Sequence, residues 1–193
     1  MTHGYAPGRS TRTRILDVAR TVFVENGFRS SSLRDIAAKA GISHPGLLHH
    51  FPTKQDLLIE ILRRRDADDA AAVEEDVAGG VDAVEALLGV VRRNTQRPGM
   101  VELFAVLSTE AVDPTHPAHE YFTERYRHTI ETLRAYFDES RSLRTSITPI
   151  DAARTTVAMM DGLQIQWLMD RDDRIDMEAT MRRYIRSLTE SSL

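Results

Sequence analysis

The chain of 193 residues contains no cysteine. This absence excludes disulfide bonds, thiolate metal sites and catalysis by a cysteine nucleophile. The sequence also has no apolar run approaching the roughly 18 residues that indicate a membrane-spanning helix. Residues 1–10 lack the apolar core of a signal peptide. We therefore expect a cytoplasmic protein that does not enter a membrane.

Alternation of polar and apolar residues, which would indicate β-strands, is also missing. Apolar residues instead recur at helical spacing between Gly, Pro and capping residues. The composition, 41% apolar and 28% charged, is typical of a globular protein, and the length allows one small and one medium domain. The sequence predicts an all-α fold of about nine helices. The six that follow the first three are expected at 54–76, 81–95, 100–111, 118–140, 149–169 and 177–188.

The most informative stretch is 31–54, SSLRDIAAKAGISHPGLLHHFPTK. Ser32 and Asp35 have the spacing of a capping box, so a helix should begin directly after Ser32. Gly41 stands where a left-handed residue can end that helix, and Ser43 can cap a second one. Two short helices across a glycine-containing turn have the spacing of a DNA-binding helix-turn-helix.

In a helix-turn-helix the second helix enters the major groove with its N-terminal residues nearest the base edges. Here those residues are His44, Pro45 and Gly46, which offer few side chains able to read bases. Arg34, at the start of the preceding helix, is the better candidate for a bidentate contact to guanine. The alternative is that Arg34 and Lys54 are ordinary solvated charges and that His49 and His50 merely pack at a helix end. The remaining candidates at the DNA, for phosphates and helix caps, are Ser31, Ser32, Ser43, His49, His50, Thr53 and Lys54.

The charge distribution agrees with a DNA-binding N-terminal part. Residues 1–55 carry eight Lys or Arg against three Asp or Glu, whereas residues 56–193 carry 17 against 26. A basic N-terminal quarter in a chain of net charge −4 results when only that part faces a polyanion. Arg9, Arg12 and Arg14 could extend this surface as an arm into the minor groove, and a mobile tail is the alternative.

The segment 11–58 carries a set of apolar, glycine, capping, basic and histidine positions: Ile15, Leu16, Ala19, Phe23, Gly27, Phe28, Ser32, Arg34, Ile36, Ala37, Gly41, Ile42, Ser43, Leu47, His50, Phe51, Lys54 and Leu57. In these positions the segment resembles the DNA-binding domain of the TetR (tetracycline-repressor) family of bacterial transcription regulators. The resemblance implies that Arg34 contacts a base, that 44–46 read sequence and that Lys54 anchors at a phosphate. Where this chain has Leu48, the family usually has a tyrosine that hydrogen-bonds a phosphate. Leu48 cannot make this contact, so the resemblance transfers it only to His49.

The resemblance also implies the domain organisation. A flexible tail at 1–10 would precede a helix-turn-helix DNA-binding domain at 11–53. An effector-binding and dimerisation domain would follow at 54–193, with 54–76 as the connecting helix.

The window 157–170, VAMMDGLQIQWLMD, is too apolar for a helix with a single buried stripe. Such a helix is covered on two sides, and Gly162 within it is compatible with close helix approach. Similar sequences occur in the penultimate helix of TetR-like regulators, which implies a homodimer through the last two helices. A core helix within one subunit is the alternative. The expected interface comprises Met160, Gly162, Trp167, Leu168, Tyr184 and Leu188.

The neighbouring helices suggest a cavity for an unidentified small-molecule effector. Aromatic and apolar side chains at helical spacing would line it, although that spacing is also typical of an ordinary core. The candidates are Phe104, Leu107, Phe122, Tyr126, Met159 and Leu163, with Glu102, His128, Asp161 and Gln164 as polar groups.

Two other patterns resemble metal sites, although a structural or solvated role is the preferred interpretation of both. Asp172, Asp173 and Asp176 form the DDxxD pattern with which isoprenoid synthases hold magnesium. His116 and His119 could be imidazole ligands, but they flank a proline and lack an obvious third ligand. A small metal-dependent helical enzyme is therefore the alternative to a regulator.

Together these features predict a homodimeric, ligand-released repressor that binds a palindromic double-stranded DNA operator. We expect no enzyme activity, no cofactor and no metal. A DNA-binding protein that needs no effector is the third alternative.

Overall fold

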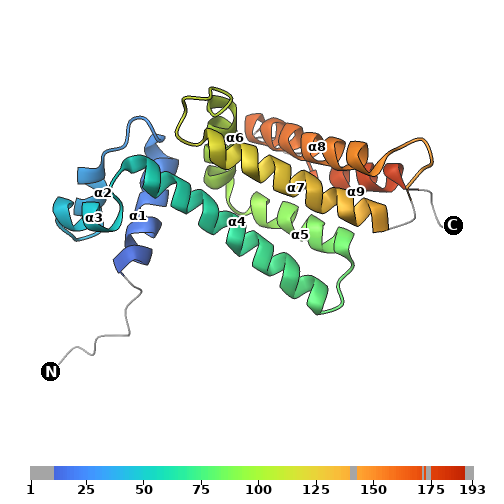
Figure 1. Ribbon diagram of the computed structural model, residues 1–193, viewed down its shortest axis with the longest axis horizontal. Coiled ribbons are helices and arrows are strands. Elements are labelled where there is room, and N and C mark those ends of the chain that lie inside the picture. The colour runs from blue at the N-terminus through green and yellow to red at the C-terminus, as the bar shows by residue number, and fades with distance from the viewer. Residues whose placement is uncertain (1–10, 140–142, 171, 173–174, 190–193) are drawn as a thin grey trace. The chain divides into compact units, whose positions relative to one another are not determined.

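The computed structural model describes residues 11–139, 143–170, 172 and 175–189. Figure 1 shows these residues folded into helices, without strands, so the all-α class is confirmed for the part of the chain that the structure describes. None of the described helices is long and apolar enough to cross a bilayer. The nine described helices are α1 (Thr11–Asn26), α2 (Leu33–Lys39), α3 (His44–His50), α4 (Lys54–Ala78), α5 (Ala83–Thr95), α6 (Pro98–Glu110), α7 (His119–Glu139), α8 (Pro149–Met169) and α9 (Met177–Leu188).

Most helix boundaries lie within two residues of the expected ones, and the differences have local causes. Helix α6 begins at Pro98, which was expected only to end the preceding helix, because proline at a first helical position loses no intrahelical hydrogen bond. Helix α5 begins at Ala83 because the Asp82 side chain accepts hydrogen bonds from the backbone N–H groups of Val84 and Glu85.

The described chain divides into two compact units, one ending at Asp68 and the other beginning at Asp69. The division falls inside α4, whereas the sequence suggested a boundary after Thr53. The first half of α4 belongs with α1 because Arg12 donates a 2.7 Å hydrogen bond to Glu60. A second ion pair, 3.2 Å between Arg64 and Asp17, joins the same two helices.

The first unit has a small apolar core contributed by α1, α2, α3 and the first half of α4. Ile15, Phe23, Ile36 and Leu47 are fully buried. Deleting a buried phenylalanine side chain costs about 3–5 kcal/mol. This core therefore fixes how α2 and α3 are presented.

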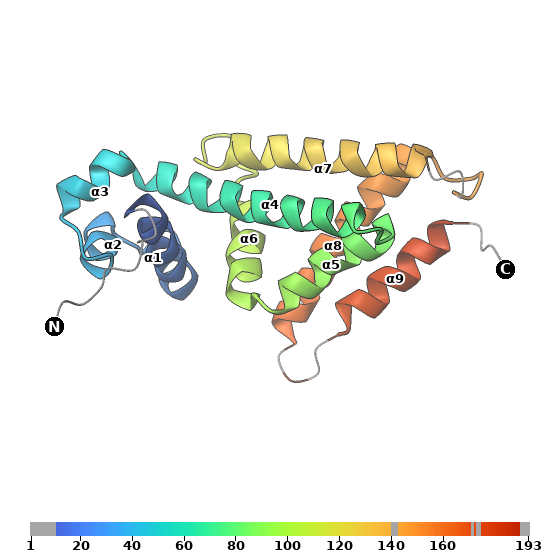
Figure 2. The ribbon, with the colours of Figure 1, turned by 90° about the horizontal axis from the view of Figure 1, so that it is seen from below.

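The second unit is organised around α8, which packs against α6, α7 and α9. Figure 2 shows α8 running between α6 and α9 in that view. One apolar cluster combines α5, α6, α8 and α9, with Trp167 at 3% exposure inside it. A second cluster joins α7, α8 and α9 around Phe137 and Leu188. Trp167 and Leu188 are thus core residues of a single subunit.

Candidate nucleic-acid interface

Helices α2 and α3 begin at capping residues that the sequence predicted. The Ser32 hydroxyl accepts a 3.1 Å hydrogen bond from the backbone N–H of Asp35, and the Ser43 hydroxyl accepts one of 3.1 Å from Gly46. Gly41, between the helices, has a φ of +67°, the left-handed conformation that glycine adopts without strain. These capping predictions are confirmed.

Thr53 and Asp56 form a reciprocal capping box at the start of α4. The backbone N–H of Asp56 donates to the Thr53 hydroxyl at 3.0 Å. The backbone N–H and the hydroxyl of Thr53 both donate to the Asp56 carboxylate, at 3.0 and 2.7 Å. The hydroxyl proton of Thr53 is therefore already committed to Asp56, and a phosphate would compete with it.

The side chains expected to read bases lie at accessible helix starts. Arg34 is exposed in the first turn of α2, and Pro45 is exposed in the first turn of α3, next to the half-buried His44. His49 is exposed in the last turn of α3, and its ring lies 5.6 Å from that of the half-buried His50. Three of the seven residues of α3 are thus histidines that border or face solvent.

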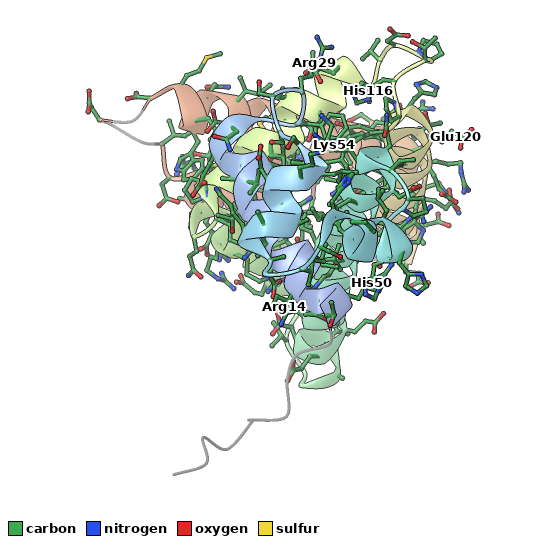
Figure 3. The ribbon with its side chains drawn as sticks, turned by 90° about the vertical axis from the view of Figure 1, so that its left-hand side faces the viewer. Arg14, Arg29, His50, Lys54, His116 and Glu120 are labelled. Atoms are coloured by element: carbon green, nitrogen blue, oxygen red, sulfur yellow. The ribbon has the colours of Figure 1, made fainter. Side chains whose placement is uncertain are left out.

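Figure 3 views this unit from one end and separates two groups of labelled residues. His50 and Arg14 appear toward one edge of the view, whereas Lys54 and Arg29 appear toward the opposite edge.

Ser31 does not present its hydroxyl to solvent. The residue is 7% exposed, and its hydroxyl donates toward the carbonyl oxygens of Gly27 at 2.7 Å and Val22 at 3.4 Å. The phosphate contact expected of the Ser31 side chain is therefore wrong for this arrangement. The Ser31 hydroxyl instead connects the turn before α2 to the end of α1.

Lys54 contacts the same turn. Its ammonium group donates to the carbonyl oxygens of Phe28 at 2.9 Å, Arg29 at 3.2 Å and Ser31 at 3.0 Å. The nitrogen also lies 4.6 Å from the centroid of the Phe28 ring. In this arrangement no ammonium proton is left for the phosphate contact expected from the sequence.

Of the arginines considered for an N-terminal arm, Arg12 is held on the protein. Its guanidinium stacks 4.7 Å from the centroid of the Phe51 ring and bonds to Glu60. That bond lowers the pKa of the Glu60 carboxyl below its ordinary value. Arg14 is exposed, whereas Arg9 and the expected tail at 1–10 lie outside the described residues.

The effector candidates divide into an inner and an outer group. On the inner side, the Phe104 and Phe122 rings meet edge to face at 4.9 Å, and the Tyr126 hydroxyl donates a 2.7 Å hydrogen bond to Asp161. Leu107, Leu163 and Gln164 are buried. Met159 packs against the apolar cluster of α5, α6, α8 and α9. Glu102 and His128 are instead exposed, because each lies on the outer face of its helix, and so neither lines an enclosed cavity.

A hollow of about 300 Å³ lies elsewhere in this unit, between α5, α7 and α9. It is lined by Asp82, Val84, Glu85, Tyr136, Arg182, Ile185, Arg186 and Thr189. None of the residues expected at the effector cavity borders it.

The residues expected at a dimer interface are largely committed to one subunit. Trp167 and Leu188 are buried in its core, and Met160, Leu168 and Tyr184 pack against that core. Gly162 has no atom within 4 Å of where a Cβ would lie, so no close helix approach within the subunit explains it. The large apolar side chains that α8 exposes are Ile165, at 41%, and Met169, at 81%.

Three residues of the metal-binding patterns, Asp176, His116 and His119, make contacts within the fold. Asp176 caps α9 by accepting a 2.9 Å hydrogen bond from the backbone N–H of Ala179. Asp172 is exposed, and Asp173 lies outside the described residues. His116 lies 3.6 Å from Glu110, and His119 bonds to the Ala111 carbonyl at 2.8 Å. The described residues contain no group of three potential ligands that could hold a metal ion.

Comparison with known families identifies both units. The family model for bacterial regulatory proteins of the tetR family matches residues 15–61. The model for the C-terminal domain of BetI-type transcriptional repressors matches residues 83–190, more than half of the chain. The chain belongs to the TetR family. Its N-terminal match contains α2 and α3, and its C-terminal match contains α5 to α9.

Relatives of this TetR-family chain are named as regulators. The HTH-type transcriptional repressor KstR2 of Rhodococcus jostii is 34% identical over 123 residues, which is 64% of this chain and 53% of that protein. The regulator UidR of Escherichia coli is 41% identical over 69 residues, 36% of this chain and 35% of UidR. The matches thus span about half or less of these relatives. The enzyme alternative receives no support from them.

Solved structures share the fold over nearly the whole TetR-family chain. Salmonella enterica GusR has a TM-score of 0.75 at 25% identity and covers 98% of this chain and 100% of its own. A regulator from Saccharomonospora viridis, solved in complex with choline, has a TM-score of 0.74 at 24% identity and covers 93% and 98%.

Proposed function

We propose that this TetR-family protein is a transcriptional repressor that binds double-stranded DNA through α2 and α3. The observation that carries the proposal is the pair of capped helices on either side of Gly41. Arg34 is exposed at the start of α2, and the half-buried His44 begins α3. In a helix-turn-helix the N-terminal residues of the second helix, here His44 to Gly46, lie nearest the base edges, and the resemblance to the family adds Arg34 from the preceding helix. Membership in the family and the repressor names of its relatives support this assignment.

Within that interface we assign separate tasks to the side chains. Arg34 reads a guanine through its paired N–H donors, and His44 contacts a base or a phosphate. His49 and His50 contact phosphates, which set register without reading sequence. Ser32 and Ser43 act indirectly, since their hydroxyls hold the first turns of α2 and α3.

We further propose that the repressor is a homodimer that joins through the outer face of α8. Ile165 and Met169 expose apolar surface there, and the open space at Gly162 lies on the same helix. Two-fold symmetry would place two recognition helices on half-sites about 34–36 Å apart, which makes the operator palindromic.

The effector site in this proposal lies between α6, α7 and α8. In this region the Phe122 ring supplies aromatic surface and Asp161 supplies a carboxylate, whereas the Phe104 ring is already covered by the Arg125 guanidinium, 4.5 Å from its centroid. Aromatic faces beside a negative charge bind organic cations, and a similar structure was solved with choline. An effector that prefers the DNA-free form by 1–3 kcal/mol would reduce operator affinity about 5- to 150-fold.

Fluorescence anisotropy with the intergenic DNA beside the protein's own gene tests these proposals. We expect salt-dependent binding of that duplex, tighter than binding of a shuffled duplex of equal length. A thermal-shift panel that includes choline tests the effector proposal separately, because a bound ligand raises the melting temperature. Equal affinity for both duplexes would contradict the repressor assignment.

A further inference from the structure

We infer that Lys54 is a positioning residue for α2 at the DNA: it clamps the turn between α1 and α2 instead of binding a phosphate itself. The inference rests on the proposed function, since it assigns to Lys54 a part in how α2 meets the operator.

The clamp is complete within the protein. A lysine ammonium group has three protons and no acceptor. The three carbonyl oxygens that Lys54 contacts, those of Phe28, Arg29 and Ser31, lie 2.9, 3.2 and 3.0 Å from its nitrogen. A phosphate could take a proton only if one of these bonds broke.

The electrostatic setting favours the clamp. The turn follows directly on the C-terminus of α1, at Asn26, where the helix dipole and unpaired carbonyls attract a cation. The Phe28 ring adds a cation–π contact 4.6 Å from the Lys54 nitrogen. A compact ammonium group suits three converging carbonyl oxygens better than the planar fork of arginine does.

The clamped turn leads directly into α2. Gly27 adopts a φ of +77°, and the Ser31 hydroxyl donates a 2.7 Å hydrogen bond to the Gly27 carbonyl oxygen. Ser32 then caps α2, and Arg34 follows in the first helical turn. Fixing the carbonyl of Ser31 therefore fixes the entry of α2 and the direction in which Arg34 leaves the protein.

Because Lys54 is the first residue of α4, its side chain also links α4 to the turn before α2. A displacement of the start of α4 would then carry the turn and the start of α2 with it. The role is thus to keep the helices of the first unit in one arrangement when the protein binds or releases DNA.

The chain has only two lysines, which makes a direct test possible. Lys39 is the matched control, because its side chain is 54% exposed. Its ion-pair partner Glu25, at 3.7 Å, is 56% exposed. Trace acetylation of the DNA-free protein, read by mass spectrometry, should modify Lys54 about tenfold more slowly than Lys39, given three hydrogen bonds to a charged group. Equal reactivity would overturn the clamp, and no variant has to fold for this measurement.

A second test compares Lys54→Met with Lys39→Met. Without DNA, we expect Lys54→Met to lower the melting temperature by about 5 °C and Lys39→Met to leave it nearly unchanged. On a duplex enriched by the wild-type protein from a random pool, Lys54→Met should reduce the preference over random DNA about fivefold or more. That loss should largely disappear in an Arg34→Ala background, because coupled residues are not additive.

A phosphate ligand would behave differently. Lys54→Met would then leave the melting temperature unchanged, weaken enriched and random duplexes equally, lower the salt slope by about 0.9 and act additively with Arg34→Ala. That combination would overturn the inference. If the wild-type protein bound no DNA, the proposed function and the role of Lys54 at DNA would both fall, whereas slow acetylation of Lys54 would still show the clamp.

Discussion

The Tyr126 hydroxyl on α7 donates a 2.7 Å hydrogen bond to the Asp161 carboxylate on α8. Burial raises the pKa of Tyr126 to about 12, and the hydrogen bond to Asp161 and its negative charge act in the same direction. Ionisation of the phenol would break the bond and place two negative charges side by side. The pair therefore joins two helices of the second unit and gives the region proposed for the effector a measurable property.

We predict that Tyr126 ionises near pH 12. Its folded-state pKa is raised above the ordinary value of about 10, so its contribution to stability is fully present below pH 10 and is lost as the pH rises through 12. The near-ultraviolet phenolate absorbance of the wild-type protein minus that of Tyr126→Phe should show a midpoint near 12. A difference midpoint near 10 would mean that Tyr126 lacks this bond in solution.

We predict that Arg34→Ala removes base preference at one position in each half-site. The expected loss is about 5- to 150-fold in the ratio of matched to mismatched duplex, equivalent to 1–3 kcal/mol. Arg20→Ala is the matched control, because Arg20 is an exposed arginine of α1 outside the helix-turn-helix. Anisotropy titrations with single-base variants of the duplex measure the ratio. Equal losses for the two variants would remove Arg34 from base reading.

We predict that Ser43→Ala destabilises the first unit by about 0.5–2 kcal/mol, because the backbone N–H of Gly46 loses its acceptor. The first turn of α3 should fray, so DNA affinity should also fall. Ser30→Ala provides the control, since Ser30 is exposed and precedes the capping residues. Urea unfolding and DNA titration, carried out on both variants, measure the two effects. Equal urea midpoints for the two variants would contradict the cap.

We predict that Met169→Glu separates the dimer without unfolding the subunit. Met169 is 81% exposed, so a charge there is tolerated by a single subunit but not at a buried interface. Trp167→Ala should do the opposite and cost about 3–5 kcal/mol of folding stability, because Trp167 lies in the subunit core. Sedimentation velocity and circular dichroism distinguish the two results. A dimeric Met169→Glu protein would place the interface elsewhere.

Local signals made much of the fold predictable. Caps such as Ser32 and Ser43, and the left-handed Gly41, act within three or four residues, so they mark helix ends directly in the sequence. Apolar spacing located the long helices for the same reason. The end of α4 was missed by two residues, because the helix continues through Val77 and Ala78 to the glycines at 79 and 80.

Contacts between distant residues were not predictable in this way. Lys54 meets carbonyl groups 23 to 26 positions earlier, and backbone carbonyls leave no mark in a sequence. Trp167 looked like an interface residue because a helix that is apolar on most sides can be covered by its own subunit or by a partner. Ile165 and Met169 belonged to the same window, but only the burial of their neighbours shows that these two point outward.

Selection of DNA by the wild-type protein from a random duplex pool, followed by footprinting of the enriched sequence, tests the central claim most directly. We predict two protected, inverted half-sites about one helical turn apart, in which Arg34→Ala removes the base preference at one position of each half-site. Enrichment no greater than that of a random duplex would contradict the account of α2 and α3 as a DNA-reading pair.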